Sequence, residues 1–484
     1  MTPAVAPSPS PSPTGTPLPS LDPSNLVPSW LPLLGVAVAL VLLVWLTVKT
    51  VTYIRADTET RASIRQAFRI RRTWPRLARN LGLTTTDRTP TLAQQLRTSP
   101  ERPKPEPRIL FPKVTTTADR FGVQIRMRTI AKVGLAEVQR EADHLAEAWG
   151  CTRVSVDVDK PGQLLLRAVR NEPLHTPIHY TPTGKPTKDL GVWDLGVDEY
   201  AQAVALRMAN VPGAAVAGLP GYGKSSLINA LIARLAPSAA VQFIVLDGKV
   251  SRADEGDYAD VIDRIAEFVG DDLDAANQLF KRLVQLRRDR SSAIRRVLGT
   301  TNMWDKGPTP AWPLLVVIVD EAHTYFRDYK GNDPETKRLA ALSAENARLV
   351  EDLVKKGRSV GITTLLATQK ATGDAIPTFI RDVCSVALSF AQKTTDAAVA
   401  ALGEDIRNWP DASPINLLDD RFVGVAVMVR QGKPGFLRVR IPYINPDRCA
   451  QVAQNCGHLT ADPFQLLTKL TGPRLVTDAL DDAA

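Results

Sequence analysis

The stretch GLPGYGKSS at residues 218–226 constrains the fold more than any other part of this sequence. It has the spacing of a phosphate-binding loop, in which glycines let the backbone turn tightly so that successive N–H groups converge on a phosphate at a helix N-terminus. The apolar run AAVAG precedes it, and the segment after it places Leu227, Leu231 and Leu235 at helical spacing. A strand before the loop and a helix after it are the context that the motif requires, so a phosphate loop is favoured over an ordinary glycine-rich turn.

Two residues of this loop have a specific expected chemistry. Lys224 would reach the β- and γ-phosphates of a nucleoside triphosphate, and the hydroxyl of Ser225 would contact Mg²⁺. Nine consecutive residues form the expected nucleotide site: Gly218, Leu219, Pro220, Gly221, Tyr222, Gly223, Lys224, Ser225 and Ser226.

A second motif, LLVVIVDE at 314–321, joins six apolar residues to two acids. A fully buried central strand needs such an apolar run. Asp320 at its end is expected to help hold Mg²⁺, and Glu321 to polarise the attacking water. Further along, LLATQK ends another apolar strand at Gln369, whose amide is expected to contact the γ-phosphate or the water. A polar strand end without a catalytic role is the alternative for Gln369.

From about residue 190, strand and helix patterns alternate along the chain. Strands are predicted at QFIVLDG, PLLVVIVDE, ITTLLATQ, CSVALSFAQ and RFVGVAVMVR, with helices between them and a long one at 271–298. This alternation predicts an α/β fold in which helices cover a parallel sheet, with the phosphate loop at the carboxyl end of a strand. Residues 108–180 instead have three strand patterns and one helical pattern, which predict a small α+β domain without a catalytic constellation.

The N-terminal residues have a different composition. The first 29 contain nine prolines and one charge, which predicts a disordered tail. Leu31–Val48 is almost wholly apolar, and a helix of that length would span about 27 Å, close to the thickness of a bilayer core. We expect one transmembrane helix at 30–54, because a cleaved signal peptide would have a basic start and a small-residue cleavage site, and neither is apparent.

A cluster of arginines follows the apolar segment. Residues 55–79 contain eight arginines against two acids, a local charge of +6 within a chain total of +9. The positive-inside tendency predicts a single-pass membrane protein with its main body in the cytoplasm. Arginines at every third or fourth position would line one helix face and contact anionic lipid, with a merely solvated basic segment as the alternative. Pro75 is expected to kink or interrupt that helix.

Five motifs, in order along residues 190–445, resemble the motor domain of the FtsK/SpoIIIE family. They are LGVDEYAQAVALRMANVPGAAVAGLPGYGKSSLINALI, FIVLDGKV, VVIVDEAH, KKGRSVGITTLLATQK and AIPTFIRDVCSVALSFAQKTTDAAVAALG. The resemblance implies a RecA-like, typically hexameric ATPase that uses ATP and Mg²⁺ to translocate double-stranded DNA. It also implies that 108–189 corresponds to the smaller domain preceding the family's motor. A single membrane helix is more similar to transfer-type members on actinobacterial mobile elements than to the division proteins with four helices.

The family's site residues can be carried over position by position. Lys224 and Ser225 take the phosphate and Mg²⁺ roles, Asp320 and Glu321 the metal and water roles, and Gln369 the role of a sensor of the γ-phosphate.

Other positions depart from the family pattern. Asp247 and Lys249 match the family's DPK stretch, with glycine in place of its proline. Family members often carry an arginine at the start of the strand CSVALSF, where it reaches the neighbour's ATP, whereas Ala387 stands there in this chain. Arg358 and Arg381 are the remaining candidates for this trans-acting group, and Arg358 is the one we include in the catalytic set.

The predicted function is a membrane-anchored, ATP-driven motor on double-stranded DNA, in conjugative transfer or in chromosome or plasmid partition. A type VII-like protein-secretion ATPase shares the motor fold but usually has several tandem motors, and a non-hydrolysing scaffold would not need the intact acidic pair. The charge outside the arginine cluster is small, so DNA contacts must use local patches. The expected organisation is a tail at 1–29, a transmembrane helix at 30–54, a basic juxtamembrane segment and linker at 55–107, an α+β domain at 108–189, a motor at 190–445 and a C-terminal tail at 446–484.

Overall fold

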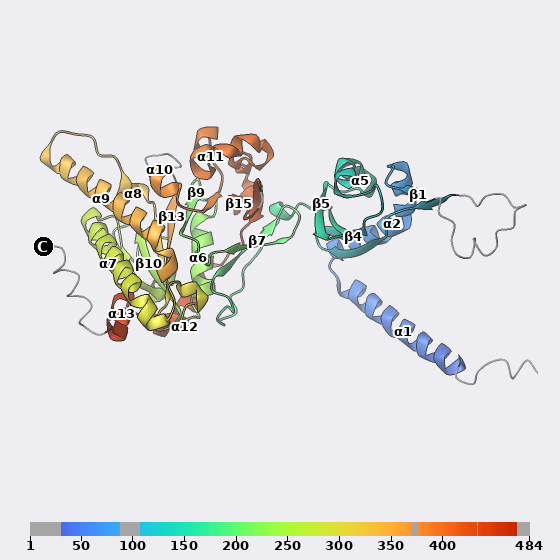
Figure 1. Ribbon diagram of the computed structural model, residues 1–484, viewed down its shortest axis with the longest axis horizontal. Helices are drawn as coiled ribbons and strands as arrows, with labels where there is room; N and C mark the ends of the chain where they lie inside the picture. Colours follow the sequence, from blue (N-terminus) through green and yellow to red (C-terminus); the bar gives the residue numbers. More distant parts are fainter. Residues whose placement is uncertain (1–30, 88–106, 370–374, 433, 472–484) are drawn as a thin grey trace, which may run out of the picture.

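The computed structural model describes residues 31–87, 107–369, 375–432 and 434–471. The chain forms a smaller folded unit, coloured blue to teal in Figure 1, and a larger unit, coloured green to red. Helix α1 (Leu31–Arg55) extends away from the smaller unit. Several side chains of α1 are not among those that the structure describes. Within the described residues, no helix is both long and apolar enough to cross a membrane. The tail predicted at 1–29 and residues 88–106 of the predicted juxtamembrane segment and linker lie outside the described residues.

The smaller unit is a four-stranded antiparallel sheet with helices packed against it, in the strand order β3–β4–β6–β5. This agrees with the α+β domain expected from the sequence. A separate antiparallel ladder of two short strands, β1 and β2, lies beside it. The strands are β1 (Thr85–Asp87), β2 (Arg108–Leu110), β3 (Val114–Asp119), β4 (Gly122–Arg128), β5 (Arg153–Lys160) and β6 (Gln163–Val169), and the helices are α2 (Thr58–Asn80), α4 (Leu135–Arg140) and α5 (Ala142–Trp149).

Helix α2 is part of the core of this unit and not of a linker, which corrects the domain boundary expected at residue 108. Its apolar face, including Ile70 and Trp74, is buried in the same cluster as the inward side chains of β4. The Trp74 indole N–H also donates to the carbonyl of Pro112 at 2.6 Å. Pro75 lies inside the helix without interrupting it. The burial of neighbouring side chains against the sheet offsets the one backbone hydrogen bond that a proline cannot make.

The larger unit is built on a ten-stranded mixed sheet in the order β11–β10–β12–β13–β9–β14–β15–β16–β7–β8. The six strands from β11 to β14 run parallel to one another, and the remaining four join them as antiparallel strands. Their bounds are β7 (Val192–Asp198), β8 (Ala203–Arg207), β9 (Gly213–Ala217), β10 (Val241–Asp247), β11 (Ile265–Val269), β12 (Leu314–Asp320), β13 (Ile362–Thr368), β14 (Val386–Ser389), β15 (Val425–Val429) and β16 (Phe436–Arg440).

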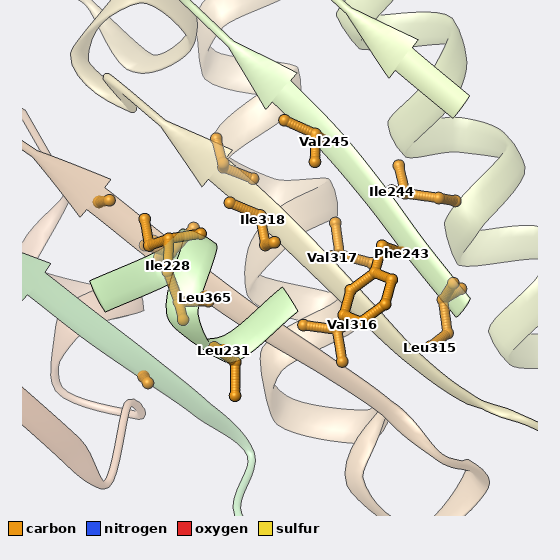
Figure 2. Packing of buried hydrophobic residues seen from close by; sticks show 14 of the residues in the cluster. Ile228, Leu231, Phe243, Ile244, Val245, Leu315, Val316, Val317, Ile318 and Leu365 are labelled. Carbon is orange, nitrogen blue, oxygen red and sulfur yellow. The ribbon is translucent and has the colours of Figure 1, made fainter. Parts of the chain in front are cut away.

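Every residue of β10, β12 and β13 is buried, as expected for parallel strands that are covered on both faces. Figure 2 shows Ile228 of one helix lying beside Ile318 of β12 and Leu365 of β13, and the side chains of β10 belong to the same buried cluster. The helices of this unit are α6 (Lys224–Leu235), α7 (Leu273–Leu298), α8 (His323–Phe326), α9 (Pro334–Lys356), α10 (Thr378–Arg381), α11 (Thr395–Leu402), α12 (Pro446–Cys456) and α13 (Pro463–Thr471).

The long helix predicted at 271–298 is α7, and its ends follow from local chemistry. The Asp272 side chain accepts from the amides of Asp274 and Ala275, which satisfies donors at the helix N-terminus. Gly299, at φ 69°, ends the helix in the left-handed conformation that glycine adopts without a steric penalty.

The structure confirms the strands predicted from apolar runs and corrects the C-terminal boundary. Strands β7, β8 and β16, which the sequence did not indicate, extend the parallel part into a mixed sheet. The segment expected to be a tail from residue 446 forms α12 and α13, and α12 buries Cys449, Val452 and Cys456 in the main core. The described part of that segment therefore belongs to the larger unit.

Candidate nucleotide site

The phosphate loop joins the end of β9 at Ala217 to the start of α6 at Lys224, as the sequence predicts. Three of its glycines are required by geometry. Gly221 and Gly223 have φ values of 79° and 108°, in the region that favours glycine. A Cβ atom on Gly218 would lie 2.6 Å from the Cβ of Phe390, so the close approach of these two segments excludes a side chain there.

A segment far along the chain supports the loop from the side. The amide of Leu219 donates to the carbonyl of Ala391 at 3.1 Å. The Tyr222 carbonyl accepts from the amide of Gly424 at 3.0 Å, and the Tyr222 hydroxyl donates to the carbonyl of Leu418 at 2.8 Å. These are mostly backbone contacts between distant segments, and no motif in the sequence indicated them.

Lys224 meets the two acids at the end of β12. Its side chain is 5% exposed, and its Nζ lies 2.9 Å from Asp320 Oδ1 and 3.8 Å from Glu321 Oε2. Strand β13 separates β9 from β12 in the sheet. Lys224, which follows β9, therefore extends past the end of β13 to contact the end of β12. A buried ammonium group is costly unless it is paired. The structure therefore brings together the lysine and the two acids that the sequence assigned to one site.

Asp320 accepts hydrogen bonds from several donors. Its Oδ2 accepts from the Tyr258 hydroxyl at 3.0 Å and from Lys249 Nζ at 3.3 Å, and its Oδ1 accepts from the amide of Glu321 at 2.8 Å. Burial by itself raises the pKa of Asp320, but the ammonium groups of Lys224 and Lys249 outweigh it and hold that pKa below its ordinary value. Burial, followed by the nearby Asp320 carboxylate, raises the pKa of Tyr258 well above its usual value. Asp320 is thus ionised, and Tyr258 is a neutral donor to it.

The Ser225 hydroxyl donates to Asp257 Oδ2 at 2.6 Å. Asp257 also accepts from Lys249 Nζ at 3.1 Å, so Lys249 bridges Asp257 and Asp320. Sequence reasoning found Lys249 from the family's DPK pattern but missed Asp257 and Tyr258. They lie in the segment after β10, and nothing in its sequence distinguishes these two side chains from ordinary surface residues.

The start of this segment is tightly constrained. Burial, followed by the charge of Asp320, raises the pKa of Asp247 to about 6. The amide of Gly248 donates to the carbonyl of Asp320 at 3.1 Å, a bond that a proline at this position would not make. A Cβ atom on Gly248 would lie 2.5 Å from Thr324 Oγ1. The glycine that departs from the family's DPK pattern is therefore the residue that fits here.

Glu321 has an unusual backbone conformation, with φ at 49°, which is uncommon for a residue other than glycine. Backbone strain of this kind is concentrated at functional sites. Its Oε2 atom is buried and has no hydrogen-bond partner among the described residues. The carboxylate is therefore oriented into the site with an acceptor atom available for a water molecule.

The two remaining catalytic candidates lie at opposite edges of the sheet. Gln369 directly follows β13, at the carboxyl edge where the phosphate loop and Asp320 lie. Arg358 lies in the short helix η5 (Arg358–Val360) before β13, at the other edge, and its side chain is exposed. A seven-residue strand is roughly 20 Å long, so Arg358 cannot reach the site of its own chain. The guanidinium of Arg381, the alternative to Arg358, donates to the carbonyl of Ala400 at 2.6 Å.

The site is compatible with Mg²⁺ but not with a dedicated metal cage. Within the described ranges, no group of three or more His, Cys, Asp or Glu side chains is arranged to hold a metal ion. Mg²⁺ is usually bound through one or two protein oxygens together with phosphates and water. The Ser225 hydroxyl and the ionised, buried Asp320 are donors of that kind.

Two protein-family models match the chain. Residues 185–309 match the FtsK/SpoIIIE family, and residues 62–170 match the N-terminal domain of actinomycete conjugal transfer proteins. The second match begins within α2, in agreement with the place of that helix in the smaller unit. The DNA translocase FtsK of Lactiplantibacillus plantarum is 27% identical over 369 residues, covering 69% of this chain and 43% of the relative. That of Haemophilus ducreyi is 26% identical, covering 54% of this chain and 28% of the relative. The chain thus spans less than half the length of these curated relatives.

Solved structures with some likeness to the chain include the pCW3 conjugation coupling protein TcpA in a monomer form with ATPγS. Its TM-score is 0.48 at 16% identity, covering 72% of this chain and 94% of that protein. The cytoplasmic domain of the type VII secretion ATPase EccC of Thermomonospora curvata has a TM-score of 0.44 at 17% identity, covering 61% of this chain and 34% of that protein. The family resemblance inferred from the motifs is confirmed as a match to the family models: residues 185–309 are similar to the FtsK/SpoIIIE family, and residues 62–170 are similar to the N-terminal domain of actinomycete conjugal transfer proteins.

Proposed function

We propose that this chain is a membrane-anchored, ATP-driven motor that translocates double-stranded DNA in conjugative transfer. The observation that carries the proposal is the buried contact between Lys224 and Asp320, with Glu321 Oε2 beside it, 3.8 Å from Lys224 Nζ and without a hydrogen-bond partner among the described residues. The curated relatives are DNA translocases, which supports DNA as the substrate. The conjugal-transfer type of the smaller domain favours transfer over partition of a chromosome or plasmid.

The proposed chemistry uses charges that are already in place. When ATP enters, Lys224 would exchange its Asp320 contact for phosphate oxygens, while Lys249 and Tyr258 continue to hold Asp320. Mg²⁺, held through Ser225 and Asp320, would neutralise phosphate charge when bound. Glu321 would then accept a hydrogen bond from the attacking water through Oε2, and Gln369 would contact the γ-phosphate or that water.

A cavity next to the loop provides room for the rest of the nucleotide. It has a volume of about 290 Å³ and adjoins Gly223 and Ser226 at the start of α6. His175, Arg421 and Tyr443 line its other walls. This position beside the phosphate loop suits the ribose and base of ATP.

The DNA-binding and assembly part of the proposal rests on charge and on the family. A motor that moves along any sequence must contact phosphates and not base edges. The body of the chain has little net charge, so one subunit would bind weakly, and a ring, which we propose to be a hexamer, would add the contacts of its members. Affinity should therefore fall steeply with salt as counterions are released.

The membrane anchor is supported by the sequence of α1 and by the surface of α2. The apolar run at 31–48 forms the greater part of α1, and α2 starts three residues after α1 ends. Helix α2 exposes several arginines, among them Arg65, Arg69, Arg72 and Arg76, while its opposite face is buried against the sheet. We propose that α1 spans the membrane once and that these arginines contact anionic lipid head groups on the cytoplasmic side.

The proposal is tested by the ATPase activity of the full chain with and without duplex DNA. Glu321→Gln should bind ATP with near-normal affinity but turn over about 100-fold more slowly or worse, because the water loses its polarising carboxylate. Glu255→Gln, an exposed residue outside the site, is the matched control and should behave as wild type. Normal turnover in Glu321→Gln would refute the site assignment, and wild-type turnover that DNA does not stimulate would refute the translocase proposal.

A further inference from the structure

Asp257 is connected to the first two turns of α6 by two separate hydrogen bonds. Its carboxylate accepts from the Ser225 hydroxyl at 2.6 Å, and its main-chain carbonyl accepts from Asn229 Nδ2 at 2.8 Å. Ser225 and Asn229 are four residues apart, so they lie on the same face of the helix. The segment after β10 is thus held against the helix that begins at the phosphate loop.

The direction of the Ser225 hydroxyl is informative because another carboxylate lies in the same site. Asp320 already accepts from the Tyr258 hydroxyl, from Lys249 and from the amide of Glu321, and it faces Lys224. In this structure these four donors surround its two oxygens, and the proposed exchange of Lys224 to phosphate would free only the position that faces Lys224. The proton of Ser225 goes instead to Asp257, whose side chain is 48% exposed and has Lys249 as its other partner.

A hydroxyl that ligates a cation uses a lone pair of its oxygen and must donate its proton elsewhere. The acceptor of that proton fixes the direction of the lone pair and makes the oxygen a better ligand, as partners of metal ligands generally do. We propose that Asp257 is a positioning residue for Mg²⁺: it holds the Ser225 hydroxyl so that the oxygen lone pair faces the metal that accompanies the nucleotide. This inference rests on the proposed nucleotide-hydrolysing function.

A purely structural role for Asp257 makes a different prediction. If its carboxylate only fastened the segment to α6, its loss would weaken nucleotide binding equally with and without Mg²⁺, and the Asn229 bond would preserve much of the contact. If the carboxylate positions Ser225, its removal should weaken nucleotide binding only when Mg²⁺ is present. The ratio of ADP affinities with and without Mg²⁺ therefore separates the two roles.

The experiment is calorimetric titration of ADP into the detergent-solubilised full chain, in Mg²⁺ or in EDTA. In Asp257→Ala, the gain in ADP affinity that Mg²⁺ gives should fall by about 10- to 100-fold, while ADP affinity in EDTA stays at the wild-type value. Asp257→Asn keeps a carbonyl oxygen as acceptor and should retain more of the gain. Asp254→Ala, on the same segment and paired with Arg252 at the surface, is the matched control and should leave the gain intact.

A double-mutant cycle with Ser225→Ala completes the test. Once the serine hydroxyl is absent, replacing Asp257 should cost little further Mg²⁺-dependent affinity, because the two residues act through one contact. An unchanged Mg²⁺ gain in Asp257→Ala, an equal loss in EDTA, or additive losses in the double variant would each overturn the role of Asp257 alone. A wild-type chain that bound no ADP in either condition would instead refute the nucleotide site, and the role of Asp257 with it.

Discussion

Both edges of the ten-stranded sheet bury positive charge, but they hold it with different partners. At the carboxyl edge, the buried ammonium group of Lys224 lies against the carboxylate of Asp320, and the more exposed Lys249 bridges Asp320 and Asp257. At the amino edge, the fully buried guanidinium of Arg290 donates to main-chain carbonyls, those of Pro313, Val360 and Gly361. Arg264 donates to the carbonyls of Ala236 and Ser238, before β10, and of Val241, at its start, and also to the hydroxyl of Thr460.

The difference shows which buried charges can change partner. A main-chain carbonyl is fixed by the backbone around it, so an arginine that donates to several of them is held in one place. Arg290 in this way joins the starts of β12 and β13. Burial lowers the pKa of Arg290 to about 9 and that of Arg264 to about 10. Burying the charged form of these side chains therefore costs free energy, which the hydrogen bonds to the main chain must offset. A lysine held by a carboxylate can exchange that anion for another anion, and phosphate is such an anion.

The largest expected effect comes from the carboxyl edge. In Lys224→Ala, affinity for ATP should fall by about 100-fold or more, because the phosphates lose their buried countercharge. The fold should persist, since Lys249 and Tyr258 still hold Asp320. Nucleotide titration and a thermal melt of the same sample measure the two quantities. ATP affinity close to wild type would show that Lys224 is a structural cation like Arg290.

The next effect, at the amino edge, should appear in stability. Arg290→Met should lower the free energy of unfolding by about 2–4 kcal/mol, because the variant loses the charged hydrogen bonds to strand ends and the stacking of the guanidinium on Trp312. ADP affinity should be unchanged. Arg288→Met, at an exposed position on the same helix, is the matched control for denaturant titration. An equal decrease in the free energy of unfolding of the two variants would mean that the buried contacts of Arg290 do not contribute to stability.

The same comparison explains what the sequence could predict about the site. The phosphate loop and the acidic pair at 320–321 could be predicted because each motif consists of consecutive residues beside a strand, where spacing is visible. Asp257 and Tyr258 are about 60 residues from Asp320 in sequence, and only the tertiary fold brings them to it. The segment at 418–424 supports the loop through its own main-chain atoms, the carbonyl of Leu418 and the amide of Gly424, which leave no side-chain signature in that segment.

The fold was predictable to the extent that burial follows a periodic pattern. Strands β10, β12 and β13 are largely apolar runs, buried along their whole length, and were predicted, whereas β7, β8 and β16 are only partly buried and mix apolar with charged residues. On α2, the regular spacing of the arginines predicted a basic exposed face. It gave no indication that Ile70, Trp74 and Ala78 on the opposite face are buried. In α12, the burial of two cysteines in the core gave no strong hydrophobic signal.

Arg358 gives the smallest expected change in the isolated subunit. It is an exposed arginine at the amino edge, with its carbonyl bound by the Trp304 indole N–H. Arg358→Ala should leave the free energy of unfolding within about 0.5 kcal/mol of wild type, as for most surface substitutions. ADP affinity should also be unchanged, because Arg358 lies at the edge opposite to its own nucleotide site. A thermal melt and an ADP titration measure these two values.

Its proposed role in a neighbouring subunit can be separated from the site within the same chain by mixing two inactive variants. An Arg358→Ala subunit keeps a complete nucleotide site, and a Lys224→Ala subunit keeps Arg358 but has no functional site. If the arginine acts across the subunit boundary, assemblies of both variants should hydrolyse ATP faster than either variant alone, since a Lys224→Ala neighbour supplies the missing guanidinium. Arg381→Ala in place of Arg358→Ala is the matched comparison, because the Arg381 guanidinium is already bound to the carbonyl of Ala400 in its own chain. No gain on mixing, or normal DNA-stimulated turnover by Arg358→Ala alone, would remove Arg358 from the catalytic set and leave the amino edge with cations that only stabilise the sheet.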